Sequence, residues 1–370
     1  MKKQHIICVV YTLLICLSII CITRTVYGPS LKNTPYLYYS FPSDMSLHTT
    51  SNSKSAYTNV LDRENVRATN SYFAASIVLL HRLDDIHKLK DVPRSSKCKF
   101  IFGLKSIDLF ASKATLNVIF GQSFPDHVPK TWIRSSKEDM IDLRRQFNID
   151  GTPRFPMIIK QDVQRQTGLT LVKHQSDLNQ SFVVCQKVLT NPLLVNNRKI
   201  NLRIYLLVVC TRTVDMYMFN DGFVYYAEDE YTPNEVTFKT HITTGYVDRK
   251  IYETNPLTLK NLYMYLGKSN AMLLKRNVHT LMNNLYSSYK KPVELHDTNS
   301  DGKCHFAILG VDLAPDKNFG VTIMEINKGP DLKEKDELDG ILKRTVIRDA
   351  LKVCNIVVNN HSKHNFMKLF

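Results

Sequence analysis

Pairs of short apolar runs, separated by polar segments, restrict most strongly what this chain can fold into. The runs lie at residues 155–160 with 168–173, 182–189 with 202–210, 215–219 with 222–227, and 307–313 with 319–326. Such runs, bounded by turn-forming residues, are typical of buried strands. Between the third pair, Asn220 and Asp221 indicate a tight turn. With helix-like stretches at 135–147, 268–290 and 337–354, the pattern predicts an α+β body rich in antiparallel hairpins.

The N-terminal segment differs from this body. Residues 6–22 carry no charge and follow Lys2 and Lys3. Their number lies at the lower limit of what crosses a bilayer, about 17–25 residues, and the sequence after them lacks a good signal-peptide cleavage site. We therefore expect a transmembrane signal-anchor within residues 1–27, with a buried helix of a soluble core as the alternative. The flanking basic residues predict a single-pass protein with a lumenal catalytic body, while a cytosolic body is left open.

Composition divides the remaining chain into two parts. Residues 28–95 are rich in Ser, Thr, Asn, Tyr and Pro without sustained periodicity, which predicts a stem or linker of low order with room for a partial helix. Residues 96–370 carry the strand and helix patterns and are expected to form one folded domain. The cysteines beyond the apolar segment are widely spaced and include no CxxC pair, so neither a disulfide framework nor a zinc site is expected.

The strongest local signal for chemistry is the sequence Met-Glu-Ile-Asn at 324–327. Side chains alternate along a strand, so Glu325 and Asn327 share one face. Asp312 lies on the preceding strand and would complete a set of oxygen ligands suited to Mg²⁺. Whether Asp312 faces the same way depends on register or on a bulge. The alternative is a strand end with solvated polar residues.

A second signal is a set of basic residues beside apolar strands. They are Lys160, Lys187, Lys199 and Arg203. Cations at strand ends can converge on a polyphosphate, and an arginine fork suits a transferring phosphoryl group. Taken singly, each lysine is better explained as an ordinary solvated strand terminus, and the functional interpretation depends on their occurrence together with the three expected metal ligands.

Other motifs are absent or incomplete. Residues 297–302 imitate the start of an EF-hand loop, but its twelfth position is Ile308 instead of a bidentate glutamate, so a polar turn is expected. No Walker A, G-x-G-x-x-G or G-x-S-x-G motif occurs.

Taken together, several segments resemble the tubulin-tyrosine ligase-like family. They are VPKTWIR (128–134), FPMIIKQ (155–161), QTGLTL (166–171), CQKVLTNPLLVNNRKINLRIYLLV (185–208), HITT (241–244) and ILGVDLAPDKNFGVTIMEINKGP (308–330). The resemblance spans residues 98–356 in the family's order. It implies an ATP-grasp fold and an ATP-dependent ligase that joins an amino acid to a protein through an acyl-phosphate, as tubulin-tyrosine ligases and polyglutamylases do.

The resemblance also implies roles for particular residues. The expected metal ligands are Asp312, Glu325 and Asn327. Lys199 and Arg203 are the expected catalytic residues, with Lys199 holding phosphate and Arg203 stabilising the transferring group. The expected ATP-binding residues, which include the adenine hinge and the hairpin over the phosphates, are Lys160, Gly168, Leu169, Gln186, Lys187, Val188, Leu189, Lys199, Asn201, Thr243 and Thr244.

Four positions depart from the family's pattern. Asn201 stands where the family usually has Asp, Thr244 where it has Asn, Val188 in place of the hinge aromatic, and Tyr225 where an arginine is usual. These departures leave two hypotheses. The first is an active ATP- and Mg²⁺-dependent protein–amino acid ligase, and the second is a membrane-tethered pseudoenzyme that binds a nucleotide or a protein partner without ligating.

The charge balance bears on the partners. The chain has 49 Lys and Arg against 34 Asp and Glu, a net charge of +15. An excess of this sign favours acidic substrates through electrostatic steering. The expected partners are a free amino acid and an acceptor protein with an acidic tail, such as tubulin, although a lumenal body would exclude tubulin. Because the basic residues are dispersed and not interleaved with aromatics, nucleic acid is not expected.

Overall fold

The structure is a computed structural model of the 370-residue chain. It describes residues 37–40, 51–71, 74–79, 99–161, 168–297, 302–356 and 363–370. The apolar segment at 6–22 lies outside these residues.

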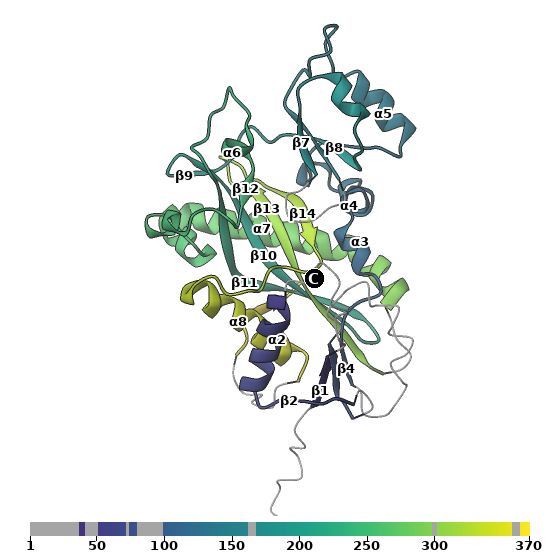
Figure 1. Cartoon of the computed structure of the whole chain (residues 1–370), viewed down its shortest axis with the longest axis vertical. Coiled ribbons are helices and arrows are strands. Elements are labelled where there is room, and N and C mark those ends of the chain that lie inside the picture. The colour runs from purple at the N-terminus through teal and green to yellow at the C-terminus, as the bar shows by residue number, and fades with distance from the viewer. Residues whose placement is uncertain are drawn as a thin grey trace, which may run out of the picture.

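A large mixed sheet forms the centre of the molecule (Figure 1). Its main strand order is β12-β11-β10-β13-β4-β3-β1-β2, with β14 also paired to β13, β15 to β11, and β9 to β10. The strands are β1 (Leu37–Ser40), β2 (Arg67–Ala68), β3 (Ile77–Leu79), β4 (Phe100–Phe102), β9 (Leu194–Val195), β10 (Arg198–Cys210), β11 (Val214–Ala227), β12 (Thr243–Thr244), β13 (Cys304–Pro315), β14 (Val321–Asn327) and β15 (Phe366–Lys368). Since β10, β13 and β14 are consecutive antiparallel neighbours, polar residues on one face of them can lie side by side.

A smaller sheet forms a separate lobe at the top of the molecule (Figure 1). Its order is β5-β8-β6-β7, made by Thr131–Ile133, Val184–Lys187, Met157–Lys160 and Leu169–Val172. Helix α5 (Lys137–Arg144), capped by Ser136, packs its Leu143 against Trp132 and Cys185 in the core of this lobe. As predicted, β6 and β7 pair antiparallel, and the helix lies within 135–147.

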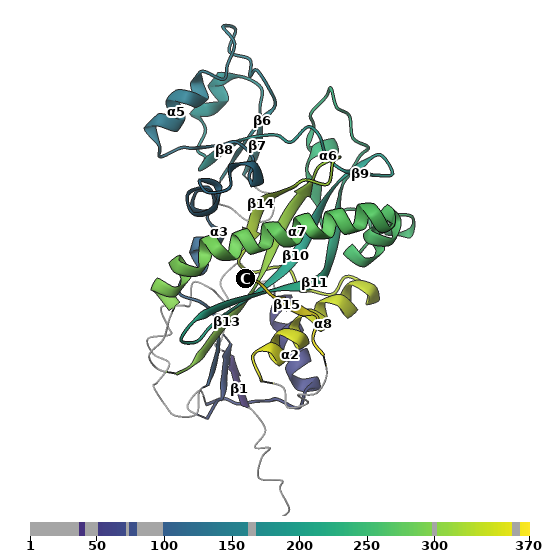
Figure 2. The same ribbon diagram turned by 180° about the vertical axis from the view of Figure 1, so that it is seen from behind.

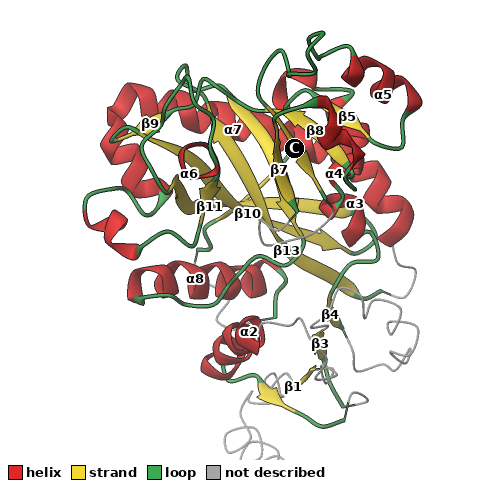
Figure 3. Cartoon of the chain, turned by 45° about the horizontal axis from the view of Figure 1, so that its top comes forward, coloured by secondary structure: helices red, strands yellow, loops and turns green. Residues whose placement is uncertain are grey.

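Helices cover both faces of the large sheet (Figures 2 and 3). The longest, α7 (Leu259–Asp297), runs across one face and buries a row at helical spacing that includes Leu274, Val278, Leu281 and Leu285. Helices α8 (Glu337–Val353) and α2 (Ser51–Arg63) contribute to a second core on the opposite face. The other short helical segments are α3 (Ile107–Ala111), α4 (Lys113–Leu116), η3 (Asn117–Gly121), η4 (Pro125–His127), η5 (Gln175–Asn179), α6 (Phe238–His241) and η6 (Arg249–Glu253).

The predicted hairpin across Asn220 and Asp221 is wrong, because one continuous strand, β11, runs through both residues. Its register against β10 shifts between the pairs Ile204–Gly222 and Leu206–Met218, so the extra residues form an irregularity in the strand and not a turn. The buried Asp221 carboxylate accepts hydrogen bonds from the backbone N–H groups of Gly222 and Lys260. Asp221 therefore links β11 to the start of α7.

Part of the segment expected to be a stem of low order is folded. Strands β1 and β3 add to the large sheet through parallel pairs, with β3 beside β4. Tyr38, Val60 and Ile77 are buried in the same core as α8. The apolar residues scattered through 37–79 supply this packing, although they lack a clear period in the sequence.

The predicted single-pass membrane localisation is corrected by the structure. Within the described residues, no helix combines the length and the apolar composition that a bilayer crossing requires. Even the longest, α7, is amphipathic, with buried leucines on one side and exposed lysines and arginines on the other.

Replacing Gly222 by alanine is expected to destabilise the fold. A Cβ there would lie 2.2 Å from the carbonyl oxygen of Arg203 on the paired strand, so the backbone must shift. We expect a loss of about 1–3 kcal/mol in the free energy of unfolding. Thermal unfolding of Gly222→Ala beside Gly329→Ala checks this, since nothing lies within 4 Å of a Cβ at Gly329. Equal melting temperatures for the two variants would contradict the expectation.

Candidate functional site

Three neighbouring strands place an arginine and two carboxylates in one row across the sheet. Arg203 on β10 is directly opposite Asp312 on β13, which in turn is directly opposite Glu325 on β14. Directly paired residues of antiparallel strands project to the same face. The register shifts immediately after Asp312, where Leu313 pairs with Ile323, so Met324 is the extra residue of a β-bulge. This bulge decides the question that the sequence left open.

Hydrogen bonds tie this row together. Arg203 Nε and Nη2 donate to the two carboxylate oxygens of Asp312 at 2.5 and 2.8 Å, a bidentate ion pair. The Asn327 amide nitrogen donates to Asp312 Oδ2 at 3.1 Å and to Glu325 Oε1 at 3.2 Å. The three predicted metal ligands are therefore in mutual contact. Rotating the Asn327 amide by 180° would direct its oxygen, in place of its nitrogen, toward the point that the two carboxylates face.

The two carboxylates differ in their electrostatic surroundings. Burial raises the pKa of Asp312 to about 6, although the Arg203 guanidinium opposes this shift. Burial also disfavours the Glu325 anion, but the nearby Lys160 and Lys113 ammonium groups outweigh it and lower the pKa of Glu325. At neutral pH both carboxyl groups are therefore mainly ionised, and both can act as anionic ligands.

Buried cations surround this pair of carboxylates. Lys160 at the end of β6 and Lys199 on β10 are each less than a tenth exposed. Burial lowers the pKa of Lys160 to about 8, while Glu325 and Asp312 act in the opposite direction. Burial, together with the repulsion of Lys160, lowers the pKa of Lys199 to about 8. Lys160 belongs to the small sheet and Glu325 to the large one, so the site joins the two sheets.

Lys113 is a member of the site that the sequence did not single out. It begins α4, is buried, and lies close enough to Glu325 and Lys160 to shift the pKa of each. The available signal was a lysine on a helix whose other residues, such as Leu116, face the core. With Lys113 included, three buried cations act on the two carboxylates and Lys199 adds a fourth beside Lys160, so the site carries an excess of positive charge that suits a polyanion.

Two neutral side chains next to Lys199 have buried polar atoms without a hydrogen-bond partner in the described residues. They are Asn201, through Oδ1, and His241, through Nε2. Asn201 lies on the same face of β10 as Lys199 and Arg203. Burial, with a smaller contribution from Lys199, lowers the pKa of His241 to about 4, so its ring is neutral. Orphaned atoms at such depth are typical of a site that a ligand completes.

The remaining predicted nucleotide residues are placed as follows. Lys187 is exposed and does not join the buried lysines. Its ammonium group lies 4.9 Å from the centre of the Phe155 ring. In the pairing of β6 with β8, Lys187 lies opposite Met157, whereas Lys160 lies opposite Val184 at the other end of the pair. Gln186 is buried and donates to Thr131 Oγ1 at 2.9 Å. Val188 is buried and Leu189 partly so. Gly168, with a φ of +73°, immediately precedes β7, which begins at Leu169, and Thr243 and Thr244 form β12.

Tyr225 takes a position directly beside the ion pair. The Arg203 guanidinium carbon lies 5.1 Å from the centre of the Tyr225 ring, a cation–π contact. Burial raises the pKa of Tyr225 to about 12, so the phenol is neutral. Tyr225 therefore adds polarizable surface to this edge of the site but no positive charge.

No cluster of three or more His, Cys, Asp or Glu side chains suited to a metal occurs in the ranges that the structure describes. The group at β13 and β14 contains two carboxylates and the amide of Asn327. Two carboxylates and an amide oxygen fit Mg²⁺, a hard ion that commonly takes few protein ligands and shares its coordination with phosphates.

Comparison with known proteins gives the chain a family. The model of the tubulin-tyrosine ligase family matches residues 106–364. Tubulin glycylase 3D of Tetrahymena thermophila is 24% identical over 229 residues, covering 56% of this chain and 22% of that protein. A probable beta-tubulin polyglutamylase of the same organism is 25% identical over 265 residues, covering 63% and 22%, and tubulin polyglutamylase ttll-4 of Caenorhabditis briggsae is 23% identical over 256 residues, covering 65% and 42%. The chain thus matches less than half of each of these relatives.

Replacing Lys160 by methionine is expected to stabilise the protein in the absence of nucleotide. Burial without full compensation by Glu325 makes the Lys160 charge unfavourable, and an apolar side chain of similar length removes that cost. We expect a gain on the order of 1 kcal/mol in the free energy of unfolding at pH 7.

Denaturant unfolding measures this gain, with Lys187→Met as the matched control, because Lys187 is an exposed lysine on the neighbouring strand of the same lobe. A Lys160→Met protein that is less stable than both the wild type and the control would contradict the expected charge strain.

Proposed function

Because the chain belongs to the tubulin-tyrosine ligase family, we propose that it is an ATP- and Mg²⁺-dependent ligase that joins an amino acid to a protein through an amide bond. The observation that supports this proposal most directly is the meeting of Asp312, Glu325 and Asn327 with the buried lysines and Arg203 at the junction of the two sheets. Opposite charges arranged in this way match what a metal-bound triphosphate requires.

The lysines are proposed to bind the phosphates. Lys160 and Lys199 lie close enough to repel each other, so a polyanion between them relieves repulsion as it binds. Lys113 adds a third positive charge on the side of Glu325. The buried polar atoms of Asn201 and His241 offer hydrogen-bonding capacity next to Lys199, where the sugar or a phosphate of ATP would find partners.

Asp312, Glu325 and Asn327 are proposed to hold the Mg²⁺ ion that accompanies ATP. When bound, the ion would neutralise charge on the phosphates. The protein's own contribution is to keep the three side chains in place: the bidentate bond from Arg203 fixes the Asp312 carboxylate, and the β-bulge at Met324 turns Glu325 toward it.

In the proposed reaction, a substrate carboxylate attacks the terminal phosphorus of ATP and releases ADP. The amine of the second substrate then attacks the resulting acyl-phosphate, forms the amide bond, loses a proton and releases inorganic phosphate. Arg203 is proposed to stabilise charge on the transferring phosphoryl group, because two of its nitrogens already bind Asp312 while its Nη1 amino group donates to no side chain or carbonyl of the described residues. The protein does little covalent work and acts by positioning and charge neutralisation.

The relatives support a choice of substrates. They are named as tubulin glycylases and polyglutamylases, so we propose glycine or glutamate as the amino acid and the acidic tail of tubulin as the acceptor. The net charge of +15 favours an acidic acceptor by raising its rate of encounter.

A second candidate function is a pseudoenzyme that binds nucleotide without ligating. It is favoured by Tyr225, whose neutral ring occupies the place beside Arg203 where the family usually has an arginine. The experiment below separates the two functions.

The ligase proposal predicts ATP-dependent incorporation of labelled glutamate or glycine into purified tubulin. Glu325→Gln removes one anionic ligand while keeping the size of the side chain, so we expect incorporation to fall by about 10²-fold or more. Glu253→Gln, which changes an exposed glutamate on η6, serves as the control and is expected to retain wild-type activity. A wild-type protein that binds ATP but incorporates neither amino acid would favour the pseudoenzyme. Equal activities of wild type and Glu325→Gln would contradict the assigned role of Glu325.

A further inference from the structure

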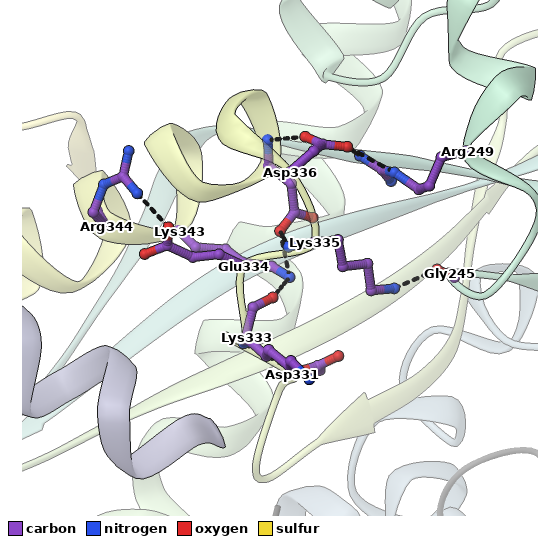
Figure 4. A network of polar contacts seen from close by, with 10 residues as sticks. Gly245, Arg249, Asp331, Lys333, Glu334, Lys335, Asp336, Lys343 and Arg344 are labelled. Atoms are coloured by element: carbon purple, nitrogen blue, oxygen red, sulfur yellow. Dashed lines mark hydrogen bonds and ion pairs between the residues drawn. The ribbon is translucent and has the colours of Figure 1, made fainter. Parts of the chain in front are cut away.

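The segment between β14 and α8 is held against the loop that follows β12 by a network of charged residues (Figure 4). Arg249, the first residue of η6 after this loop, pairs with Asp336, the N-cap of α8. Next to this pair, the Lys335 ammonium group donates a hydrogen bond to the carbonyl oxygen of Gly245. The two segments are therefore joined at two adjacent points.

Lys335 is connected to the proposed catalytic centre through a short chain of contacts. A Cβ at Gly245 would lie 3.2 Å from two carbons of the Tyr225 ring, so Gly245 packs directly against that ring. The same ring contacts Arg203. The other end of the segment, Pro330, lies near Arg203. A Cβ at Gly310 would lie 3.1 Å from Pro330 Cβ and 3.0 Å from Arg203 Cδ, so both residues pack against Gly310. The segment thus begins at Pro330, near Arg203, and at Lys335 it contacts the loop whose Gly245 packs against Tyr225.

Most cations of this network are already neutralised. Arg344 pairs with Glu334 and Glu337, and the buried Lys343 pairs with Asp339 at 2.9 Å and donates to the carbonyl oxygen of Lys333 at 2.5 Å. Lys335 differs, because the described residues place no carboxylate within ion-pair distance of its ammonium group, whose hydrogen-bond acceptor is the Gly245 carbonyl.

Lys335 is also accessible and held in position. It is exposed, and its ammonium group lies 4.5 Å from the centre of the exposed Tyr246 ring. Burial of the ammonium end and the nearby Lys343 lower the pKa of Lys335, while Asp331 and Asp339 act in the opposite direction. A lysine ammonium has three donors, so two remain for a ligand after the bond to Gly245.

We propose that Lys335 binds a substrate carboxylate that is not activated in the reaction, and that it supplies the positive charge which Tyr225 does not provide. This inference rests on the proposed ligase function, in which an amino acid and an acidic acceptor both carry such spectator carboxylates. Gly245, which packs against the Tyr225 ring, accepts the hydrogen bond of Lys335, so a carboxylate bound to Lys335 would lie near that ring, and a charge-assisted hydrogen bond there would orient the substrate for attack. Lys335 acts as a specificity-determining residue and takes no part in bond formation.

The kinetic test compares Lys335→Met with Lys333→Met and Lys335→Arg in the incorporation assay with glutamate and tubulin. Lys333 is an exposed lysine on the same segment, so its replacement makes the same charge change. Loss of one charge-assisted bond is expected to raise a KM about tenfold or more in Lys335→Met, with kcat nearly unchanged, while Lys335→Arg restores most of the affinity. A raised KM for glutamate identifies the free amino acid as the source of the carboxylate, and a raised KM for tubulin identifies the acceptor.

A binding experiment keeps this proposal separate from the ligase function. The anisotropy of a fluorescein-labelled tetraglutamate peptide measures carboxylate binding by the full chain with no need for turnover. Weaker binding by Lys335→Met than by the wild type and Lys333→Met supports the site, even if the wild type incorporates no amino acid and the ligase function fails. If incorporation proceeds and Lys335→Met changes neither KM nor peptide binding, or changes kcat alone, the carboxylate role of Lys335 is overturned.

Discussion

The bidentate ion pair between Arg203 and Asp312 is the interaction on which the rest of the site depends. Its two members are directly paired residues of β10 and β13, and Asn327 bonds to the same Asp312 carboxylate. A buried ion pair contributes little net stability, because the cost of removing two charges from water offsets their attraction. We therefore attribute its presence to positioning. Gly310 is required for it, since the Arg203 side chain lies directly against that glycine.

The buried lysines near this ion pair carry positive charge that the described residues do not fully neutralise. The pKa of both Lys160 and Lys199 is lowered to about 8, and the two lysines repel each other. This arrangement lowers the stability of the protein without ligand and favours the binding of a polyanion. The site is therefore preorganised for its ligand at the cost of stability. The same reasoning applies on a smaller scale to Lys335 in its proposed role.

Much of the architecture could be predicted from the sequence, because period-2 and helical spacing record which face of each element is buried. The pairing of β13 with β14 and the helix at α8 followed from such patterns. Three features could not be read in this way. The bulge at Met324 depends on a register that only the assembled sheet defines, Lys113 reaches the site through tertiary packing, and Asn220 with Asp221 carries a turn signal that continuous sheet pairing overrides.

Calorimetric titration with Mg²⁺ and ATP at pH 7 and at pH 9 tests the central claim most directly. Lysines with ordinary pKa values remain charged at both pH values, whereas Lys160 and Lys199, with pKa values of about 8, lose most of their protons by pH 9. If these lysines hold the phosphates, ATP binds at pH 7 and its affinity falls at least about tenfold at pH 9. Equal affinity at both pH values, or no binding at pH 7, would contradict the account.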